Sequence, residues 1–259
     1  MILVLDAGNT NITLGVYDGD NLLFVSRLAT DHSRTEDQFA IDINSIFTLN
    51  NCKPVQFYGA VLSSVVPEIT VALKNAVKKV TGHKPIIVGP GIKTGLDIRV
   101  DSPAHLGADL VAGSIAAIAK YPLPCLIMDL GTATKVSVID SNGAFRGCTI
   151  SPGVEISINA LSKNASQLPH ISLESPTHTI GTNTIDCMRA GIVYGTADML
   201  DGLCERIEKE LGTSVKSIVS TGGIAKEIIP YCKRDIILNN NLLLEGLKLI
   251  YDKNSWLFN

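Results

Sequence analysis

The fold is decided by a stretch near the start of the chain that reads Val4-Leu5-Asp6-Ala7-Gly8-Asn9-Thr10. An apolar run ends in an acidic residue, a glycine turn follows, and apolar and polar residues then alternate through Val16. Alternation with a period of two is typical of a half-buried strand. A second turn at Gly19-Asp20 leads into another such run over residues 22–28. The sequence therefore predicts an antiparallel meander whose first turn carries an Asp-x-Gly motif.

The same pattern occurs again in the second half of the chain, where it reads Ile127-Met128-Asp129-Leu130-Gly131-Thr132-Ala133. Each copy is followed by an alternating strand, and the two strands end in acids, at Asp18 and Asp140. Self-similarity of this kind indicates a duplication. It predicts two similar domains, over residues 1–118 and 119–259, that face one another across a cleft with each turn pointing into it.

The rest of the sequence supplies helices and strands for two such domains. Periodicity and capping residues predict helices from about Thr35, from Pro67 to Val80, over residues 180–206 and over residues 242–251. Short apolar runs predict buried strands over residues 57–65, 85–88 and 215–219. The fold class expected from this alternation is α/β.

The composition is that of a globular protein, with 46% hydrophobic and 18% charged residues among 259. The net charge is -3 and the basic residues are scattered singly, so we expect no nucleic-acid partner and no membrane partner. No apolar stretch approaches the ~18–20 residues that span a bilayer. The first apolar run stops at Asp6, so it is predicted to be a strand and not a signal peptide. A cytoplasmic location is expected.

The cysteines and histidines point to no metal or disulfide framework. The six cysteines form no C-x-x-C pair and are expected to be reduced thiols. The five histidines show no H-x-x-x-H spacing, so no zinc site is expected.

The two Asp-x-Gly turns are candidates for phosphate binding. A turn between two strands presents several backbone N–H groups on one side, and such a concave row of donors binds phosphate oxygens. Gly8 and Gly131 let the backbone approach a ligand without a Cβ in the way. Asp6 and Asp129 would repel phosphate unless a cation lies between them, so each is a candidate cation ligand, directly or through water. Either motif alone could be an ordinary hairpin turn, but two copies in register with a repeat favour phosphate binding.

Two further features have alternative interpretations. Thr221-Gly222-Gly223 follows an apolar strand and could admit a nucleotide base or ribose, or could be only a tight strand-to-helix turn. Asp109 lies near the start of an apolar helix over residues 110–119. It could be a base that accepts a hydroxyl proton during phosphoryl transfer, or a carboxylate that complements the helix dipole.

Taken together, these motifs resemble the signature blocks of the type III pantothenate kinases, in the family's order and over nearly the whole chain. The matching blocks are Asp6-Ala7-Gly8-Asn9-Thr10-Asn11, Ser63-Ser64-Val65-Val66-Pro67, Gly89-Pro90-Gly91, Lys93-Thr94-Gly95-Leu96, Gly107-Ala108-Asp109, Asp129-Leu130-Gly131-Thr132-Ala133-Thr134, Pro152-Gly153, Gly181-Thr182-Asn183-Thr184 and Thr221-Gly222-Gly223. That family belongs to the acetate and sugar kinase, Hsc70 and actin superfamily. The resemblance therefore implies duplicated actin-like, ribonuclease H-like domains with mixed sheets flanked by helices.

The resemblance also implies roles for individual residues. The ATP-phosphate segment corresponds to Asp6, Ala7, Gly8, Asn9, Thr10, Asn11, Ile12 and Thr13, with Thr132 as a further ATP contact. Asp109 matches the catalytic base, Asp129 a monovalent-cation ligand, and Asp6 is the candidate for the divalent ion, directly or through water. The substrate block comprises Val100, Gly107, Ala108, Asp109 and Leu110, and Thr184 resembles a contact supplied by the partner subunit. The implied cofactors are ATP with Mg²⁺ and a monovalent cation, K⁺ or NH₄⁺, and the implied assembly is a homodimer.

Four positions depart from the family's usual pattern. Leu110 stands where the family usually has Arg, and Val100 where it usually has Tyr; in the family these two help to hold the pantothenate carboxylate. Loss of a charge-assisted contact of this kind costs ~1.5–3 kcal/mol. Lys135 stands where the family generally has Thr, and Cys148 where it generally has Gly. Lys135 is a candidate for a replacement positive charge.

The function implied is ATP-dependent phosphorylation of pantothenate to 4'-phosphopantothenate, the first step of coenzyme A biosynthesis. Because the phosphate-turn residues are retained and the acceptor-end residues are altered, two alternatives stay open. One is a kinase for a related small alcohol that lacks the carboxylate. The other is a nucleotide-binding regulatory homologue with little turnover.

Overall fold

The computed structural model describes residues 1–258, which divide into two compact units. The first unit consists of Met1–Leu96, Asp101–Ala116 and the chain from Leu242 onward, and the second of Asp97–Val100 and Ala117–Asn241. The chain passes from the first unit to the second after Ala116, inside helix α3 (Ala108–Lys120). The C-terminal segment from Leu242 packs with the first unit. The repeat alone would assign it to the second half of the chain.

The first unit is built on a five-stranded mixed sheet. Its strands lie in the order β3 (Asn21–Ala29), β2 (Asn11–Asp18), β1 (Ile2–Ala7), β4 (Gly59–Ser64) and β5 (Ile86–Ile87). The pairs β1–β2 and β2–β3 are antiparallel, whereas β4 runs parallel to both β1 and β5. The predicted meander is thus confirmed, with the Asp-x-Gly turn between β1 and β2.

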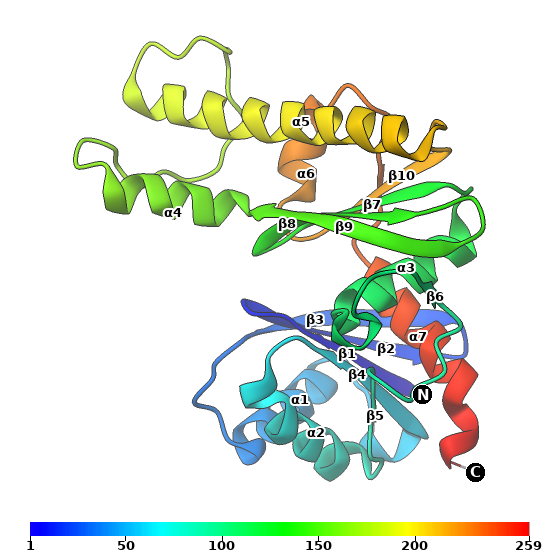
Figure 1. Cartoon of the computed structure of the whole chain (residues 1–259). Coiled ribbons are helices and arrows are strands. Elements are labelled where there is room, and N and C mark those ends of the chain that lie inside the picture. The colour runs from blue at the N-terminus through cyan, green and yellow to red at the C-terminus, as the bar shows by residue number, and fades with distance from the viewer. Residues whose placement is uncertain (259) are drawn as a thin grey trace. The chain divides into compact units, whose positions relative to one another are not determined.

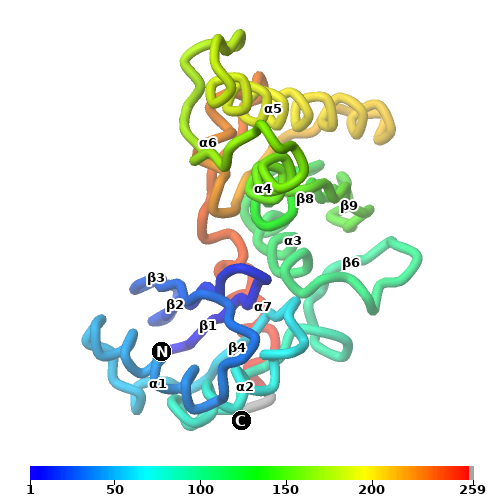
Figure 2. The backbone as a smooth tube through the Cα atoms, turned by 90° about the vertical axis from the view of Figure 1, so that its left-hand side faces the viewer, coloured from blue at the N-terminus to red at the C-terminus, as the bar shows by residue number. Residues whose placement is uncertain are grey.

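Helices cover both faces of this sheet (Figures 1 and 2). Alternate residues of β1 point to opposite sides, so Leu3 and Leu5 pack in a core with α1 (Glu36–Leu49) and α2 (Pro67–Thr81). Ile2 and Val4 pack in a second core with α3 and α7 (Leu242–Asn254). The capping box predicted at Thr35 is present, with the Gln38 side chain accepting from the Thr35 N–H.

The second unit repeats this topology and adds one edge strand, β6, which runs parallel to β9. Its strands lie in the order β11 (Ile237–Leu238), β10 (Ser217–Thr221), β7 (Cys125–Leu130), β8 (Ala133–Ile139), β9 (Ala144–Pro152) and β6 (Asp97–Ile98). As in the first unit, the central strand begins an antiparallel meander on one side and has parallel strands on the other. The duplication inferred from the two Asp-x-Gly motifs is therefore seen in the connection of the strands.

Three helices pack in the core of the second unit, namely α4 (Val154–Asn164), α5 (Thr184–Leu211) and α6 (Ala225–Ile228). Helix α5 begins and ends later than the residues 180–206 predicted. Asn183 caps it by accepting from the Asp186 N–H at 3.0 Å, and Gly212 ends it in the left-handed conformation. Short 3₁₀ turns occur at Pro54–Gln56, Pro103–His105, Ile229–Tyr231 and Ser255–Phe258. Among residues 1–258 no helix is both long enough and apolar enough to cross a bilayer.

Candidate active site

The backbone of the first Asp-x-Gly turn is fixed by hydrogen bonds, and the side chains at its tip are exposed to solvent. The Gly8 N–H donates to Asn11 O at 3.0 Å, the Thr30 hydroxyl donates to Gly8 O at 2.6 Å, and the Thr30 N–H donates to Thr10 O at 3.0 Å. The side chains of Asn9, Thr10 and Asn11 are exposed. The turn therefore has a fixed backbone shape and an accessible outer surface, as a phosphate-binding turn requires.

The predicted ATP residues around this turn differ in what they can contribute. The side chains of Ala7 and Ile12 are fully buried in the core, so only their backbone atoms could contact a ligand. Asp6 is half-buried and lies opposite Thr13 on β2 and Ser63 on β4. One hairpin thus brings the whole predicted segment, from Asp6 to Thr13, to one end of the sheet.

The second turn is tighter than the first. Leu130 pairs with Thr134 across it, so three residues form the turn, whereas four residues lie between the paired Ala7 and Ile12. The Gly131 N–H donates to Ala133 O at 3.2 Å, and Thr132 at the tip is exposed. Thr132 is therefore accessible for the ATP contact that the sequence predicts.

Two glycines let other segments of the second unit touch this turn. A Cβ on Gly153, which directly precedes α4, would lie 2.5 Å from Gly131 O and closer still to Thr132 O. A Cβ on Gly222, whose φ is +102°, would lie 2.5 Å from the carbonyl carbon of Leu130. Real side chains do not approach so closely, so both positions require glycine. The start of α4 and the end of β10 are thereby held against the turn.

An ion pair lies directly beneath the second turn. Asp129 and Lys135 are paired residues on β7 and β8, and Lys135 Nζ lies 2.7 Å from Asp129 Oδ2. The two side chains are only 17% and 18% exposed, so the pair is largely shielded from solvent. At the matching place in the first unit the residue opposite Asp6 is Thr13. The sequence named Lys135 as a candidate positive charge but did not predict its partner.

Asp109 lies in the first turn of α3. Its Oδ1 accepts from the Leu110 N–H at 2.8 Å, and a Cβ on Gly107 would lie 2.5 Å from the same oxygen. Glycine at position 107 thus leaves room for the carboxylate at the positive end of the helix. The position agrees with both interpretations of Asp109, because the side chain is half-buried and still reachable from solvent. Leu110 and Val100 are also half-buried, with Leu110 in the first unit and Val100 in the second.

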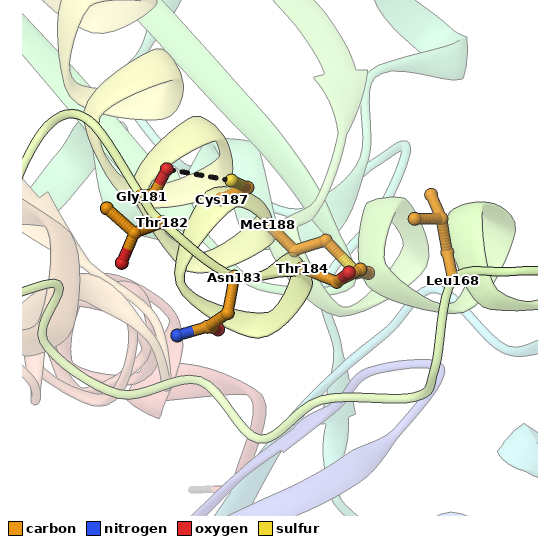
Figure 3. A pocket seen from close by; sticks show the side chains of 7 residues that line it. All are labelled: Leu168, Gly181, Thr182, Asn183, Thr184, Cys187 and Met188. Carbon is orange, nitrogen blue, oxygen red and sulfur yellow. Dashed lines mark hydrogen bonds between the residues drawn. The ribbon is translucent and has the colours of Figure 1, made fainter.

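Thr184 lies in a hollow at the start of α5. The hollow has a volume of about 540 Å³ and is lined by Leu168, Gly181, Thr182, Asn183, Thr184, Cys187 and Met188. Figure 3 shows Leu168 on the segment after α4, apart from the other residues, which lie at and before the first turn of α5. The Cys187 thiol donates to Gly181 O at 3.2 Å and fixes the incoming chain. Ile180 and Ile185, close by in sequence, are 83% and 42% exposed.

The class of protein follows from these features. Two units of the same topology, each with an Asp-x-Gly turn after its central strand, form the actin-like α/β fold of sugar kinases and related ATPases. A solved structure of the activator of the 2-hydroxyisocaproyl-CoA dehydratase from Clostridium difficile with bound ADPNP aligns with a TM-score of 0.59 and 13% identity, covering 99% of this chain and 96% of that one. The ROK hexokinase from Thermus thermophilus aligns with a TM-score of 0.52 and 13% identity, covering 98% and 99%. At such identities the likeness concerns the fold alone.

Comparison of the sequence with known families and proteins identifies the family of this chain. The family described as type III pantothenate kinase matches residues 2–206. A type III pantothenate kinase from Exiguobacterium sp. is 43% identical over 98% of this chain and 99% of that protein, and one from Shouchella clausii is 41% identical over 98% and 100%. The chain belongs to the type III pantothenate kinase family, and it is therefore an enzyme of the kinase class. Both conclusions agree with what the sequence motifs predict.

Proposed function

We propose that this protein transfers the terminal phosphoryl group of ATP to the primary hydroxyl of pantothenate, giving 4'-phosphopantothenate, as the first step of coenzyme A biosynthesis. The observation that carries the proposal is membership of the family over nearly the whole chain. The retention of an accessible Asp-x-Gly turn in each unit supports it, because phosphoryl transfer depends chiefly on positioning and on charge stabilisation of the phosphates.

In this proposal both turns contact the phosphates of ATP. Within the predicted segment from Asp6 to Thr13, the exposed part of the turn supplies the contacts, with the side chains of Asn9, Thr10 and Asn11, and Thr132 supplies a hydroxyl. Asp6 holds Mg²⁺, directly or through water. Mg²⁺ in kinases is bound by one or two carboxylates together with substrate phosphates. This fits the described residues, in which no group of three or more His, Cys, Asp or Glu lies together as a metal cage.

Asp109 acts as the base in this proposal, and Gly107, Ala108, Leu110 and Val100 are assigned to the acceptor. Asp109 is the carboxylate of α3's first turn, and a carboxylate that is reachable from solvent can accept or orient a hydroxyl proton. Leu110 and Val100 offer no hydrogen-bond donor from their side chains. This single feature favours a second candidate function, a kinase for a related alcohol that lacks the carboxylate.

We also propose a homodimer in which Thr184 contacts the substrate of the partner subunit. The hollow at the start of α5 and the exposed side chains of Ile180 and Ile185 support a contact surface there, because association sites commonly expose apolar surface before the partner binds. A cytoplasmic location is part of the proposal. All six cysteines lie among the described residues and none is in a disulfide. That agrees with a reducing compartment.

The remaining cofactor is the monovalent cation that the resemblance implies at Asp129. A carboxylate such as that of Asp129 can bind a monovalent cation. In this proposal one positive charge is required next to Asp129. In the structure the Lys135 ammonium lies on this carboxylate.

The experiment that tests the proposal measures ADP formation by the purified protein with pantothenate, with pantetheine and with a panel of small alcohols. Asp109→Asn should lower turnover by about 10²–10⁴, as expected for a positioned general base, while binding of an ATP analogue stays nearly intact. Asp101→Asn, an exposed carboxylate on the preceding segment, is the matched control. Phosphorylation of pantetheine but not pantothenate would favour the second candidate. ATP binding without turnover of any acceptor would favour a regulatory protein.

A further inference from the structure

The pair formed by Asp129 and Lys135 is fixed by the sheet itself. The two residues lie opposite each other on adjacent antiparallel strands, two residues from a tight turn, so the separation of their side chains is set by the strand register. Exposed ion pairs on flexible side chains contribute little. Here both groups are more than four-fifths buried and Nζ lies 2.7 Å from Oδ2, which is a charge-assisted hydrogen bond.

This pair lies directly beside the turn that is a candidate for phosphate binding. A Cβ on Gly131 would lie 3.4 Å from Asp129 Oδ1, so one oxygen of the carboxylate faces the turn while the other accepts from Lys135. A bare carboxylate at this distance would raise the energy of any phosphate bound by the turn. A positive charge next to the Asp129 carboxylate is therefore needed for the turn to bind phosphate, and the Lys135 ammonium supplies one.

The first unit shows that the fold does not itself require a lysine here. The residue opposite Asp6 in the equivalent strand pair is Thr13, which carries no charge. Threonine at this register position therefore fits a hairpin of the same topology. Lys135 is an addition specific to the second unit, and its ammonium carries the same charge as the K⁺ or NH₄⁺ that the resemblance implies at Asp129.

We infer that the Lys135 ammonium takes the place of the monovalent cation, so that nucleotide binding and turnover need no added K⁺ or NH₄⁺. The inference rests on the proposed function for its catalytic part. An ion held by the chain cannot be diluted away, whereas a diffusible ion must be present at a concentration near its dissociation constant. Lys135→Thr restores the residue type found at the matching position of the first unit and should create a cation site at Asp129.

The test compares wild type, Lys135→Thr and the control Lys216→Thr, which removes an exposed lysine beside β10 of the same sheet. Activity is measured in a tetramethylammonium chloride buffer, with KCl or NH₄Cl replacing that salt at constant ionic strength. Wild type and the control should change by less than about twofold, whereas Lys135→Thr should lose about ten- to a hundred-fold without K⁺ and regain most of it with K⁺ or NH₄⁺.

A second measurement does not depend on turnover. The unfolding midpoint is recorded with Mg²⁺ and a non-hydrolysable ATP analogue in the same salts, and K⁺ should raise it for Lys135→Thr but not for wild type. This measurement reports on the cation even where pantothenate is not the acceptor, so failure of the proposed function is distinguishable from failure of the inference. A wild-type protein stimulated several-fold by K⁺, or a Lys135→Thr variant without K⁺ dependence in either measurement, overturns the inference.

Discussion

Gly153 offers a direct test of whether the second turn belongs to the nucleotide site. Its φ is -69°, so alanine has no backbone penalty there and Gly153→Ala adds only the volume of one methyl group. That methyl would lie 2.5 Å from Gly131 O, whereas real Cβ atoms keep at least 3.0 Å. The start of α4 and the turn must therefore separate by about 0.5 Å or more, at the end of the turn where Thr132 lies.

The size of the effect follows from hydrogen-bond geometry. A backbone hydrogen bond to phosphate of about 2.9 Å that lengthens by about 0.5 Å leaves the 2.7–3.2 Å range of good bonds. Loss of one bond to a charged group costs ~1.5–3 kcal/mol, so the dissociation constant for a Mg²⁺–ATP analogue should rise about ten- to a hundred-fold. Overpacking of this kind should also lower the free energy of unfolding by ~1–3 kcal/mol.

Two measurements separate these effects. Titration calorimetry with a non-hydrolysable ATP analogue gives the affinity, and urea unfolding followed by circular dichroism gives the stability. The control is Gly202→Ala on α5, where a Cβ would meet nothing within 4 Å and alanine should stabilise the helix by up to about 1 kcal/mol. A Gly153→Ala variant that is less stable but binds the nucleotide as tightly as wild type would remove the second turn from the nucleotide site.

Two other expected outcomes concern the acceptor and the dependence of stability on pH. If pantothenate is the acceptor, Leu110→Arg combined with Val100→Tyr should lower its KM by about ten- to a hundred-fold in steady-state kinetics, with little change for pantetheine; an unchanged KM would mean that the new side chains do not reach the carboxylate. Burial of Asp140 opposes its charged form, but hydrogen bonds from the Ala144 and Asn142 N–H groups and from Arg146 outweigh this and hold the pKa of the carboxyl below its usual value. Because the folded pKa is the lower one, this stabilisation is complete above the unfolded pKa of about 4 and is lost as pH falls through the folded value. The urea midpoints of wild type and Asp140→Asn should therefore differ at neutral pH and converge in acid, and a difference that persists at low pH would contradict this account.

The sequence predicts the strands and turns of the two sheets because that information is local. An apolar run, an acid and a glycine turn specify a hairpin without reference to the rest of the chain, and the capping box at Thr35 is likewise local. The predicted limits of α5, residues 180–206, are wrong at both ends, although the sequence contains signals for the true limits. Asn183 and Gly212 are a capping residue and a glycine terminator, and both are readable from sequence.

Two kinds of feature in the site could not be predicted from the sequence. They are side-chain pairs that depend on strand register and contacts between residues far apart along the chain. The partner of Lys135 follows from a three-residue turn, and a slip of one residue would send its side chain to the other face of the sheet. The contact of Gly153 with the turn joins segments about twenty residues apart, and that of Gly222 joins segments about ninety apart. Only the folded chain shows that these glycines are required by a neighbouring backbone.

The structure also bears on how an altered acceptor site could still recognise a carboxylate. From the sequence, Lys135 is a candidate to replace the positive charge that arginine supplies at position 110 in the family. An ammonium that lies 2.7 Å from Asp129 Oδ2 is already neutralised by that carboxylate, and a neutral pair attracts a second anion far less than a single cation does.

Lys135 and Leu110, two of the four departures from the family pattern, are therefore of different kinds. Lys135 adds a positive charge where an acid needs one, and Leu110 removes a positive charge where an anionic acceptor would need one. The two can be separated by kinetics. In saturating K⁺, Lys135→Thr should leave the pantothenate KM unchanged, because the ion restores the charge at Asp129 and the acceptor is not held by Lys135. A large rise in that KM, with ATP affinity unaffected, would instead assign Lys135 to the acceptor and would explain how the protein tolerates leucine at position 110.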